Sequence, residues 1–433
     1  MILKNASLIL GYRSFVTHPM NNSSMNISHV LVFLFLSAQT FAQYPGIEKD
    51  IVENRKGQLI IKAKSGSKVS VEQLSHEFWF GGAISNGLAG DNWSVEDKRQ
   101  YKAKFLENFN SAVTENAVKW GNMERKQGEM NYATVDGILE WADANQVRIR
   151  GHNIYWGINK FVQPWLKTMD NSELEKTLMN RAYDVASRYK GRFVEYDLNN
   201  EMIHGNFYED RLGDGITKKM TEWFHEVDPN AKLWVNDYDI LTGNKLEAYM
   251  SHIRKLLAQG VPVAGIGVQG HLHAEKFDRA ELKRSLDSLS IFGLPIKVTE
   301  FNVPGQRSKW VGNKSDKLNP EQELSKAEEL VDYYKICFAQ PLVNGILQWG
   351  FWEGSNWIPA SSMYRRDWSP TPAAYAYQNL IFKQWWTKTS GIMDKDGQSE
   401  IPAFYGKYKI TVDGAEREVV LSKERGKLEL DFM

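Results

Sequence analysis

Strand-like and helix-like segments alternate without a break between residues 76 and 386, and no other feature of the sequence limits the fold as much. Each short apolar run is followed by a longer segment in which apolar residues recur at helical spacing. The clearest of these helices are Ser172 to Tyr189 and Pro320 to Ala339. Regular alternation over roughly 310 residues predicts an α/β fold, a parallel (β/α)8 TIM barrel. The expected strands are 78–84, 111–114, 148–156, 193–200, 232–237, 264–270, 295–299 and 344–349.

Short strand-like segments at both ends of the chain have no helices between them. Near the N-terminus they are 58–63 and 68–71, and near the C-terminus 408–412, 418–421 and 428–432. A few short strands cannot bury an apolar face alone, so we expect the two ends to pair in one small β-sandwich. The expected domains are a discontinuous β-sandwich formed by 43–75 and 387–433, and a barrel formed by 76–386.

The first 42 residues read as a leader and a signal peptide. The apolar run Val30 to Leu36 is too short to span a membrane, and the small residues around Ala42 suit a cleavage site. We expect the mature protein to begin near Gln43, to be secreted or periplasmic, and to contain no membrane span. Either Met1 or Met25 can be the true start.

Composition excludes several classes of partner. The 433 residues carry 53 basic and 53 acidic side chains, and this balance argues against nucleic acid as a partner. A single cysteine, Cys337, excludes an intrachain disulfide. His271 and His273 have no accompanying ligand cluster, so we expect no metal and no cofactor. The 15 tryptophans serve either as core or as flat faces on which sugars stack. We expect a monomer.

Carboxylates follow two of the expected strands. Asn200 and Glu201 lie at the end of 193–200, and Glu300 follows 295–299, so the two glutamates are 99 positions apart (300 − 201). The carboxyl ends of the strands form the floor of the active site in a parallel barrel. Two carboxylates at that floor suggest the catalytic pair of a retaining glycosidase.

Several motifs at the strand ends occur in the order known from glycoside hydrolase family 10, the retaining endo-β-1,4-xylanases, which the chain resembles over about residues 76–386. Residues 199–208 are most similar to the branch of that family shared with plants. The motifs are Thr114 to Trp120, Arg150 to Trp156, Asp197 to Glu201, Val235 to Tyr238, Gln269 to His271, Val298 to Phe301, and Trp349-Gly350 with Trp357.

The resemblance implies an enzyme that hydrolyses xylan or arabinoxylan through a covalent glycosyl-enzyme. Glu201 corresponds to the acid/base and Glu300 to the nucleophile, and His271, Asn200 and Asn302 correspond to supporting residues. The residues expected to contact the sugar chain are Glu115, Asn116, Lys119, His152, Trp156, Tyr238, Gln269, Trp349 and Trp357. The alternatives are another β-linked glycan as substrate, or a barrel that binds carbohydrate without catalysis.

One supporting position departs from the family pattern. Asn302 stands where the family usually has an aspartate that completes a carboxylate, imidazole, carboxylate chain with His271 and Glu300. An amide holds an imidazolium less firmly than a carboxylate does, so we expect an altered pH optimum and an unchanged reaction. If Asn302 instead faces the barrel wall, it does not meet His271.

Overall fold

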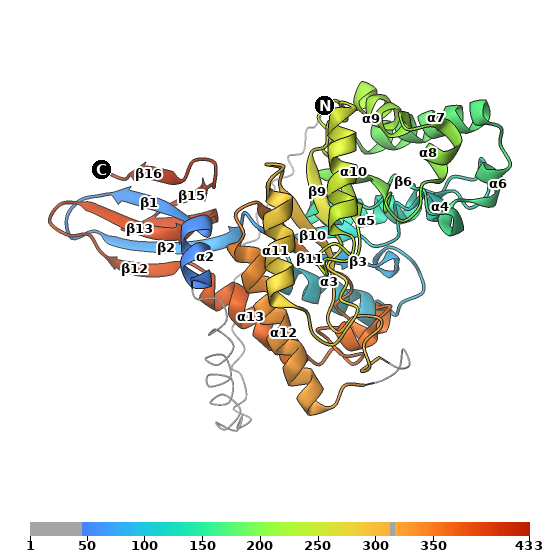
Figure 1. The fold of residues 1–433 in the computed structure, drawn as a ribbon. Helices are drawn as coiled ribbons and strands as arrows, with labels where there is room; N and C mark the ends of the chain where they lie inside the picture. Colours follow the sequence, from blue (N-terminus) through green and yellow to red (C-terminus); the bar gives the residue numbers. More distant parts are fainter. Residues whose placement is uncertain (1–45, 312–316) are drawn as a thin grey trace, which may run out of the picture. The chain divides into compact units, whose positions relative to one another are not determined.

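The computed structural model describes residues 46–311 and 317–433, and parallel strands close into a barrel between residues 79 and 348 (Figure 1). The strands are β3 (Trp79–Ile84), β4 (Ser111–Thr114), β5 (Arg148–Gly151), β6 (Tyr155–Trp156), β7 (Glu195–Asn200), β8 (Leu233–Asp237), β9 (Gly265–Val268), β10 (Ile296–Phe301) and β11 (Val343–Gln348). β5 and β6 both pair with β7, so these nine strands fill eight positions and close the sheet. The expected barrel is confirmed.

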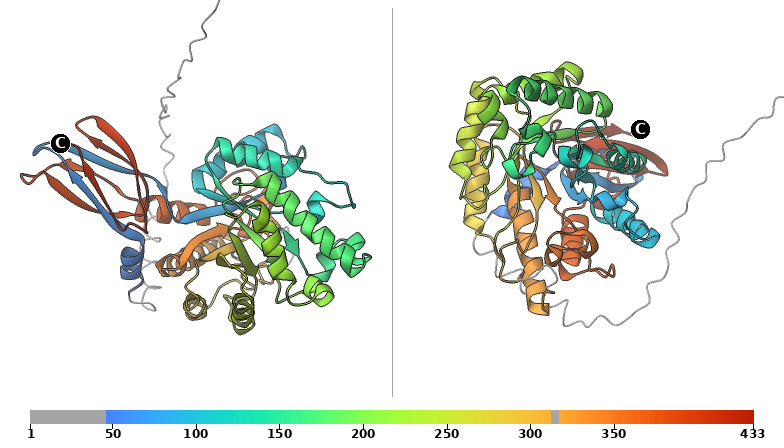
Figure 2. Two further views of the ribbon diagram at one scale, coloured as in Figure 1. Left: turned by 90° about the horizontal axis from the view of Figure 1, so that it is seen from above. Right: turned by 90° about the vertical axis from the view of Figure 1, so that its right-hand side faces the viewer.

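Helices connect successive strands and form the outer layer around the barrel (Figure 2). Their apolar faces pack on the barrel strands in the largest buried cluster of the described chain. The helices are α3 (Val95–Asn108), α4 (Trp120–Met123), α5 (Ala133–Ala144), α6 (Pro164–Lys167), α7 (Asn171–Tyr189), α8 (Phe207–Leu212), α9 (Ile216–Val227), α10 (Leu246–Ala258), α11 (Arg279–Ser290), α12 (Pro320–Ala339) and α13 (Pro372–Asn379).

The expected strand 148–156 is two strands separated by an irregular segment. The backbone N–H of His152 leaves the ladder and donates to Oγ1 of Thr114 at 2.9 Å. The N–H of Ile154 then donates to the carbonyl of Asp197 on β7 at 2.9 Å. This break leaves both His152 and Trp156 near the carboxyl end of the barrel, which one continuous strand could not do.

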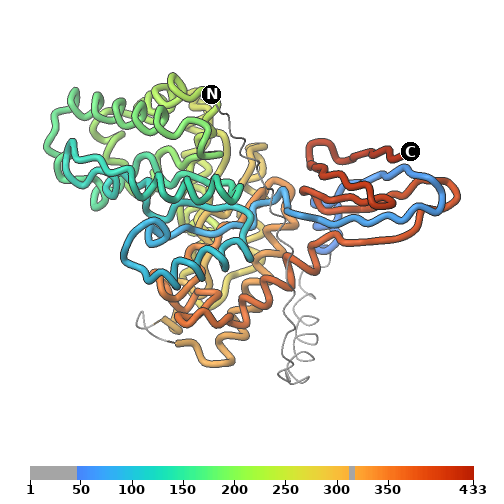
Figure 3. The backbone as a smooth tube through the Cα atoms, turned by 180° about the vertical axis from the view of Figure 1, so that it is seen from behind, coloured from blue at the N-terminus to red at the C-terminus, as the bar shows by residue number. Residues whose placement is uncertain are grey.

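Strands from both ends of the chain lie side by side in two further sheets, drawn blue and red in Figure 3. One sheet has the order β13-β1-β16 and the other β12-β2-β14-β15. Their inner faces share a buried cluster that includes Leu59, Ile61, Val71, Tyr408 and Ile410. The expected sandwich of terminal strands is confirmed. The strands are β1 (Lys56–Lys62), β2 (Lys68–His76), β12 (Lys388–Ile392), β13 (Gln398–Phe404), β14 (Gly406–Val412), β15 (Ala415–Leu421) and β16 (Lys427–Asp431).

A helix that sequence patterning did not indicate, α2 (Ile47–Arg55), precedes these strands. Arg55 at its end is 6% exposed and donates hydrogen bonds to the carbonyl oxygens of Phe338, Gln340 and Val343 at the α12–β11 turn. These bonds attach the terminal strands to the barrel at the amino end of β11. The expected leader and signal peptide, 1–42, lie outside the described residues. Within the described ranges, no helix has the length and apolar character needed to cross a membrane.

Candidate active site

The two glutamates expected to carry the chemistry lie at the carboxyl ends of β7 and β10. Both are buried, Glu201 at 7% exposed and Glu300 at 4%. Glu201 has a backbone φ of 59°, a left-handed conformation that costs energy for a residue with a side chain. Its N–H donates to the carbonyl of Asn236 and its carbonyl accepts from His204 and Gly205, which fix this turn.

The carboxyl of Glu201 accepts hydrogen bonds at both oxygens. Gln269 donates to Oε1 at 2.7 Å, and the indole N–H of Trp156 donates to Oε2 at 2.8 Å. Burial raises the pKa of Glu201 above its usual value, and the negative charge of Glu300 adds to this effect against the hydrogen bond from Gln269. A carboxyl of this kind holds its proton to higher pH.

Glu300 has the opposite surroundings. Nε2 of His271 donates to Oε2 at 3.0 Å, and Nδ2 of Asn236 donates to Oε1 at 3.1 Å. Burial acts to raise the pKa of Glu300, but the charge of His152 and the hydrogen bond from His271 outweigh it and lower the pKa below its usual value. The two environments push the pKa values of the carboxyls apart, so Glu201 holds its proton to higher pH than Glu300 does.

Asn302 meets His271, as one of the two sequence interpretations requires. Its Oδ1 atom lies 3.3 Å from Nδ1 of the imidazole, and Asn302 is fully buried. The side chains of Glu300, His271 and Asn302 therefore form a continuous chain of contacts. Nδ2 of Asn302 has no hydrogen-bond partner in the part of the protein that the structure describes. A rotation of the amide would place this donor against the imidazole, so Asn302 can serve either protonation state of His271.

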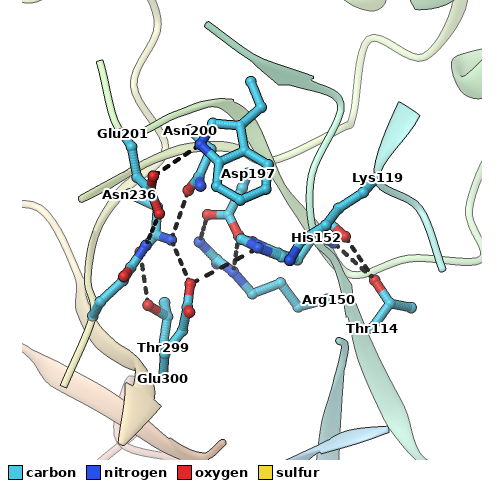
Figure 4. A network of polar contacts seen from close by, with 12 residues as sticks. Thr114, Lys119, Arg150, His152, Asp197, Asn200, Glu201, Asn236, Thr299 and Glu300 are labelled. Carbon is cyan, nitrogen blue, oxygen red and sulfur yellow. Dashed lines mark hydrogen bonds and ion pairs between the residues drawn. The ribbon is translucent and has the colours of Figure 1, made fainter. Parts of the chain in front are cut away.

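Asn236, at the end of β8, links β7 and β10, and although it lies in the motif Val235 to Tyr238 the sequence analysis gave it no role. Its Nδ2 donates both to Oδ1 of Asn200 at 2.9 Å and to Oε1 of Glu300 at 3.1 Å. Its Oδ1 accepts from the hydroxyl of Thr299 at 2.6 Å. Figure 4 shows Asn236 between these side chains. Asn236 shares the strand-end placement of Asn200 and Glu300, and that placement is the signal that could have identified it.

A buried ionic network below the two glutamates was also missed. Arg150 on β5 is fully buried and pairs with Asp197 on β7 (Figure 4). It also pairs with Glu195 on the same strand. Oδ2 of Asp197 accepts from Nδ1 of His152 at 2.8 Å, and Nε2 of His152 lies 3.9 Å from Glu300. His152 thus lies between the carboxylate of Asp197 and that of Glu300.

The polar residues expected to bind sugar gather beside this centre. Nζ of Lys119 donates to Oδ1 of Asn116 at 2.9 Å and lies 4.9 Å from the ring centre of Trp156. Burial raises the pKa of Glu115 to about 7, against the nearby charge of Lys119. Nδ2 of Asn200 is buried and has no partner among the described residues, which leaves a donor for a sugar hydroxyl.

Aromatic rings border the centre. The ring of His271 lies 6.2 Å from that of Trp349 and 5.3 Å from that of Trp357, both in edge-on contact. Tyr238 stacks on His204 with ring centres 3.6 Å apart, and the charge of Glu201 is among the causes that, after burial, raise the pKa of Tyr238. The structure therefore brings the sequence-predicted residues together at one end of the barrel. Across residues 46–311 and 317–433 there is no group of three or more side chains suited to a metal ion.

Known proteins match this chain over most of its length. Residues 74–380 match the model of the glycosyl hydrolase family 10. Anti-sigma-I factor RsgI6 of Acetivibrio thermocellus is 34% identical over 370 residues, which cover 84% of this chain and 45% of that protein. Endo-1,4-beta-xylanase 1 of Arabidopsis thaliana is 32% identical over 422 residues, which cover 95% and 41%. The chain thus spans less than half the length of these curated relatives.

A solved structure has the same barrel. The crystal structure of xylanase 10B from Thermotoga petrophila RKU-1 in complex with xylobiose superposes with a TM-score of 0.63 at 25% identity. The superposition covers 71% of this chain and 95% of that chain. The family match spans the described barrel and includes Glu201 and Glu300. The chain belongs to glycosyl hydrolase family 10.

Proposed function

We propose that the protein is an endo-β-1,4-xylanase that retains the anomeric configuration of its substrate. The observation that carries this proposal is the opposite environment of the two glutamates, since the pKa of Glu201 is raised and that of Glu300 is lowered. A retaining glycosidase needs one protonated carboxyl and one ionised carboxylate at the same bond. Similarity to endo-1,4-beta-xylanase 1 of Arabidopsis thaliana supports xylan as the substrate.

The proposed reaction has two displacements. A carboxylate oxygen of Glu300 attacks the anomeric carbon and forms a C–O bond while the glycosidic C–O bond breaks, and the proton of Glu201 passes to the leaving oxygen. Water then attacks the same anomeric carbon while Glu201 takes a proton from the water. The C–O bond between this carbon and Glu300 breaks. The free donor of Asn200 is suited to the sugar hydroxyl next to the reacting carbon. Hydrogen bonds from His271 and Asn236 hold Glu300 ionised between turnovers.

We also propose that the protein is exported. The apolar run Val30 to Leu36 and the small residues before Gln43 support this proposal from sequence alone. Expression of the full chain in a bacterial host followed by N-terminal sequencing of the released protein tests it. A mature protein beginning near Gln43 is the expected result, and an uncleaved protein retained in the cytoplasm contradicts it.

A side-by-side assay tests the reaction and its substrate. Unsubstituted xylan, arabinoxylan and cellulose are incubated with the wild type and with Glu300→Gln, and the products are separated by size. We expect short xylo-oligosaccharides from the two xylans, none from cellulose, and none from the variant. Glu175→Gln, a change at a surface salt bridge on α7, is the matched control and should keep full activity.

The anomeric form of the first products separates the mechanism from the substrate. Proton NMR within the first minutes of hydrolysis should show the β anomer before mutarotation. The α anomer as first product would contradict the retaining mechanism and would not contradict xylan as the substrate. Activity on cellulose alone would contradict xylan as the substrate and would not contradict the retaining mechanism. Binding of xylan without any product would favour the non-catalytic barrel.

A further inference from the structure

A cavity of about 220 Å³ lies where the terminal strands meet the barrel, at the end opposite the active site. Its wall includes Trp79 and Arg148, which begin β3 and β5, and Val343, which begins β11. The other side is formed by Arg55 at the end of α2 and by Lys423, which follows β15. Amino ends of barrel strands usually contribute stability, so a polar cavity there needs a separate explanation.

Three cations line this cavity. Arg55 donates only to backbone carbonyl oxygens, Nη1 of Arg148 donates to the carbonyl of Glu77 at 3.0 Å, and Nζ of Lys423 donates to the carbonyl of Pro341. Among the described residues, none of the three forms an ion pair within 4.0 Å, whereas the buried Arg150 of the barrel interior has two carboxylate partners. Carbonyl oxygens satisfy N–H groups but do not neutralise the charge.

The negative charge at the cavity does not balance these cations. Within the described lining, Glu77 is the one carboxylate, and its Oε2 accepts from the backbone N–H of Lys423 at 2.8 Å. His76 adds no charge near neutral pH, because burial lowers its pKa to about 4. Three cations and one carboxylate leave a net charge of about +2 around an open space.

Arg55 is buried, Arg148 is half-buried and Lys423 is exposed, and the partial loss of hydration of these unbalanced cations is unfavourable. Loss of hydration is the main cause that lowers the pKa of Arg55 to about 9 and that of Lys423 to about 8, and the charge of Arg55 contributes to the lowering at Lys423. Arg148 behaves in the same way, with a pKa lowered to about 10 by burial. An anion bound in the cavity would pair with these cations and offset the cost of their lost hydration, since charges removed from water are normally paired.

We propose that this cavity is a binding site for a small oxyanion, a carboxylate or phosphate group held between Arg148 and Lys423 with Arg55 behind it. A guanidinium fits both groups because its N–H donors match two oxygens at once. Tyr405, half-buried in the wall, adds a ring face suited to a sugar that carries the carboxylate. A bound anion would join the terminal strands to the barrel floor and stabilise the folded chain. The site is independent of the function proposed above.

Titration calorimetry on the full chain tests the site. Sodium phosphate and sodium glucuronate are titrated at constant ionic strength set by sodium chloride, with glucose as the uncharged control. We expect saturable binding of at least one anion, no binding of glucose, and a melting temperature that rises with that anion. Tighter binding of glucuronate than of phosphate would identify a sugar acid as the ligand, and the reverse would identify a free anion.

Variants connect the binding to the cavity. Lys423→Met changes an exposed residue and Arg148→Met a half-buried one, and each should weaken binding about tenfold by removing a charged hydrogen bond. Lys395→Met, at an exposed lysine in the turn between β12 and β13, is the matched control and should bind as the wild type does. Absence of saturable binding by either anion overturns the proposal. Binding that Lys423→Met and Arg148→Met leave unchanged also overturns it.

Discussion

Nε2 of His271 lies 3.0 Å from Oε2 of Glu300, so the imidazole directly supports the ionised form of this carboxylate. Asn302 contacts the other ring nitrogen at 3.3 Å. Asn302→Asp places a carboxylate there and favours the imidazolium form of His271 to higher pH. We expect the pH profile of kcat/KM to shift by about one pH unit, which corresponds to about 1.4 kcal/mol. Initial rates on xylan from pH 4 to 10 measure the shift.

A surface substitution of the same type controls for added charge. Asn230→Asp introduces a carboxylate on the exposed turn before β8 and should leave the profile unchanged. NMR titration of the His271 ring signals in the Asn302→Asp protein gives a direct second measurement. A lower melting temperature with an unmoved profile would mean that the new carboxylate is buried without a partner and does not act through His271.

Trp156 donates one hydrogen bond of 2.8 Å to Oε2 of Glu201, and this bond acts to lower the pKa of Glu201. The indole N–H favours the carboxylate form of Glu201. Trp156→Phe removes this donor and should therefore raise the pKa of Glu201 further. Glu201 acts as an acid only while protonated, so activity should persist to higher pH and the alkaline limb should move upward. The ring of Phe161, stacked at 3.7 Å, gives the new phenyl ring a contact.

The matched control for this change is Trp165→Phe. Its indole N–H is buried without a partner in the described part of the chain, so its removal should not move the pH profile. The position of the limb is the informative measurement, because Trp156 is also expected to contact the sugar and its loss raises KM. A limb that stays in place, or moves to lower pH, would show that the indole N–H does not control Glu201.

The parallel barrel explains why both glutamates could be expected at the carboxyl ends of strands from the sequence alone. Glu201 and Glu300 each follow a run of apolar residues, and parallel strands in a closed barrel bring such positions to one face. The contacts of Asn236 could not be obtained in this way. They require that β8 be adjacent to β7 and that one amide reach both Asn200 and Glu300, which depends on side-chain rotamers.

The elements that sequence missed lack an apolar pattern for a physical reason. All five residues of β12 are exposed, since it is the edge strand of its sheet. β13 alternates exposed and half-buried residues until Ala403 and Phe404, so its pattern is weak. Helix α2 buries Ile51 and Arg55, and a buried arginine reads as a surface residue in the sequence. Packing against other parts of the chain determines all three elements.

The terminal sandwich depends on a small apolar core. Leu59 is fully buried between its two sheets, and Leu59→Ala removes apolar contacts and leaves a cavity. We expect the free energy of unfolding to fall by about 2–5 kcal/mol in chemical denaturation. Val420→Ala, at a residue 52% exposed on β15, should change it by less than about 0.5 kcal/mol. Equal effects of the two substitutions, or an unchanged melting temperature on deletion of 393–433, would contradict a core shared by both termini.

Glu195 balances two buried cations in the barrel interior. Lys297 donates to its Oε1 at 2.6 Å and Arg150 donates to the same oxygen. Burial acts to raise the pKa of Glu195, but these cations lower it below the usual value of 4.5. Since the folded pKa lies below the unfolded one, this stabilisation is present above pH 4.5 and is lost as the pH falls toward the folded pKa.

Glu195→Gln leaves Lys297 without a charged partner and should lower the free energy of unfolding by about 3 kcal/mol at pH 7. The variant should also lose less stability than the wild type does when the pH falls below 4.5. Urea denaturation at pH 7 and pH 4 measures both effects. Glu175→Gln, which removes a surface pair with Lys219, should cost less than about 1 kcal/mol. A similarly small loss in Glu195→Gln would mean that the interior network does not depend on this carboxylate.

Removal of the acid separates the two displacements of the proposed mechanism. In Glu201→Ala, an aryl xyloside with an acidic phenol needs little protonation, so formation of the glycosyl-enzyme should largely survive while its hydrolysis slows for want of a base. Azide, which needs no base, should then restore turnover and give a β-glycosyl azide, identified by NMR. Glu300→Ala should show no such rescue with retained configuration, since no nucleophile remains to form the intermediate. An α-glycosyl azide from Glu201→Ala would mean that azide attacks the substrate directly and that the roles of Glu201 and Glu300 are exchanged.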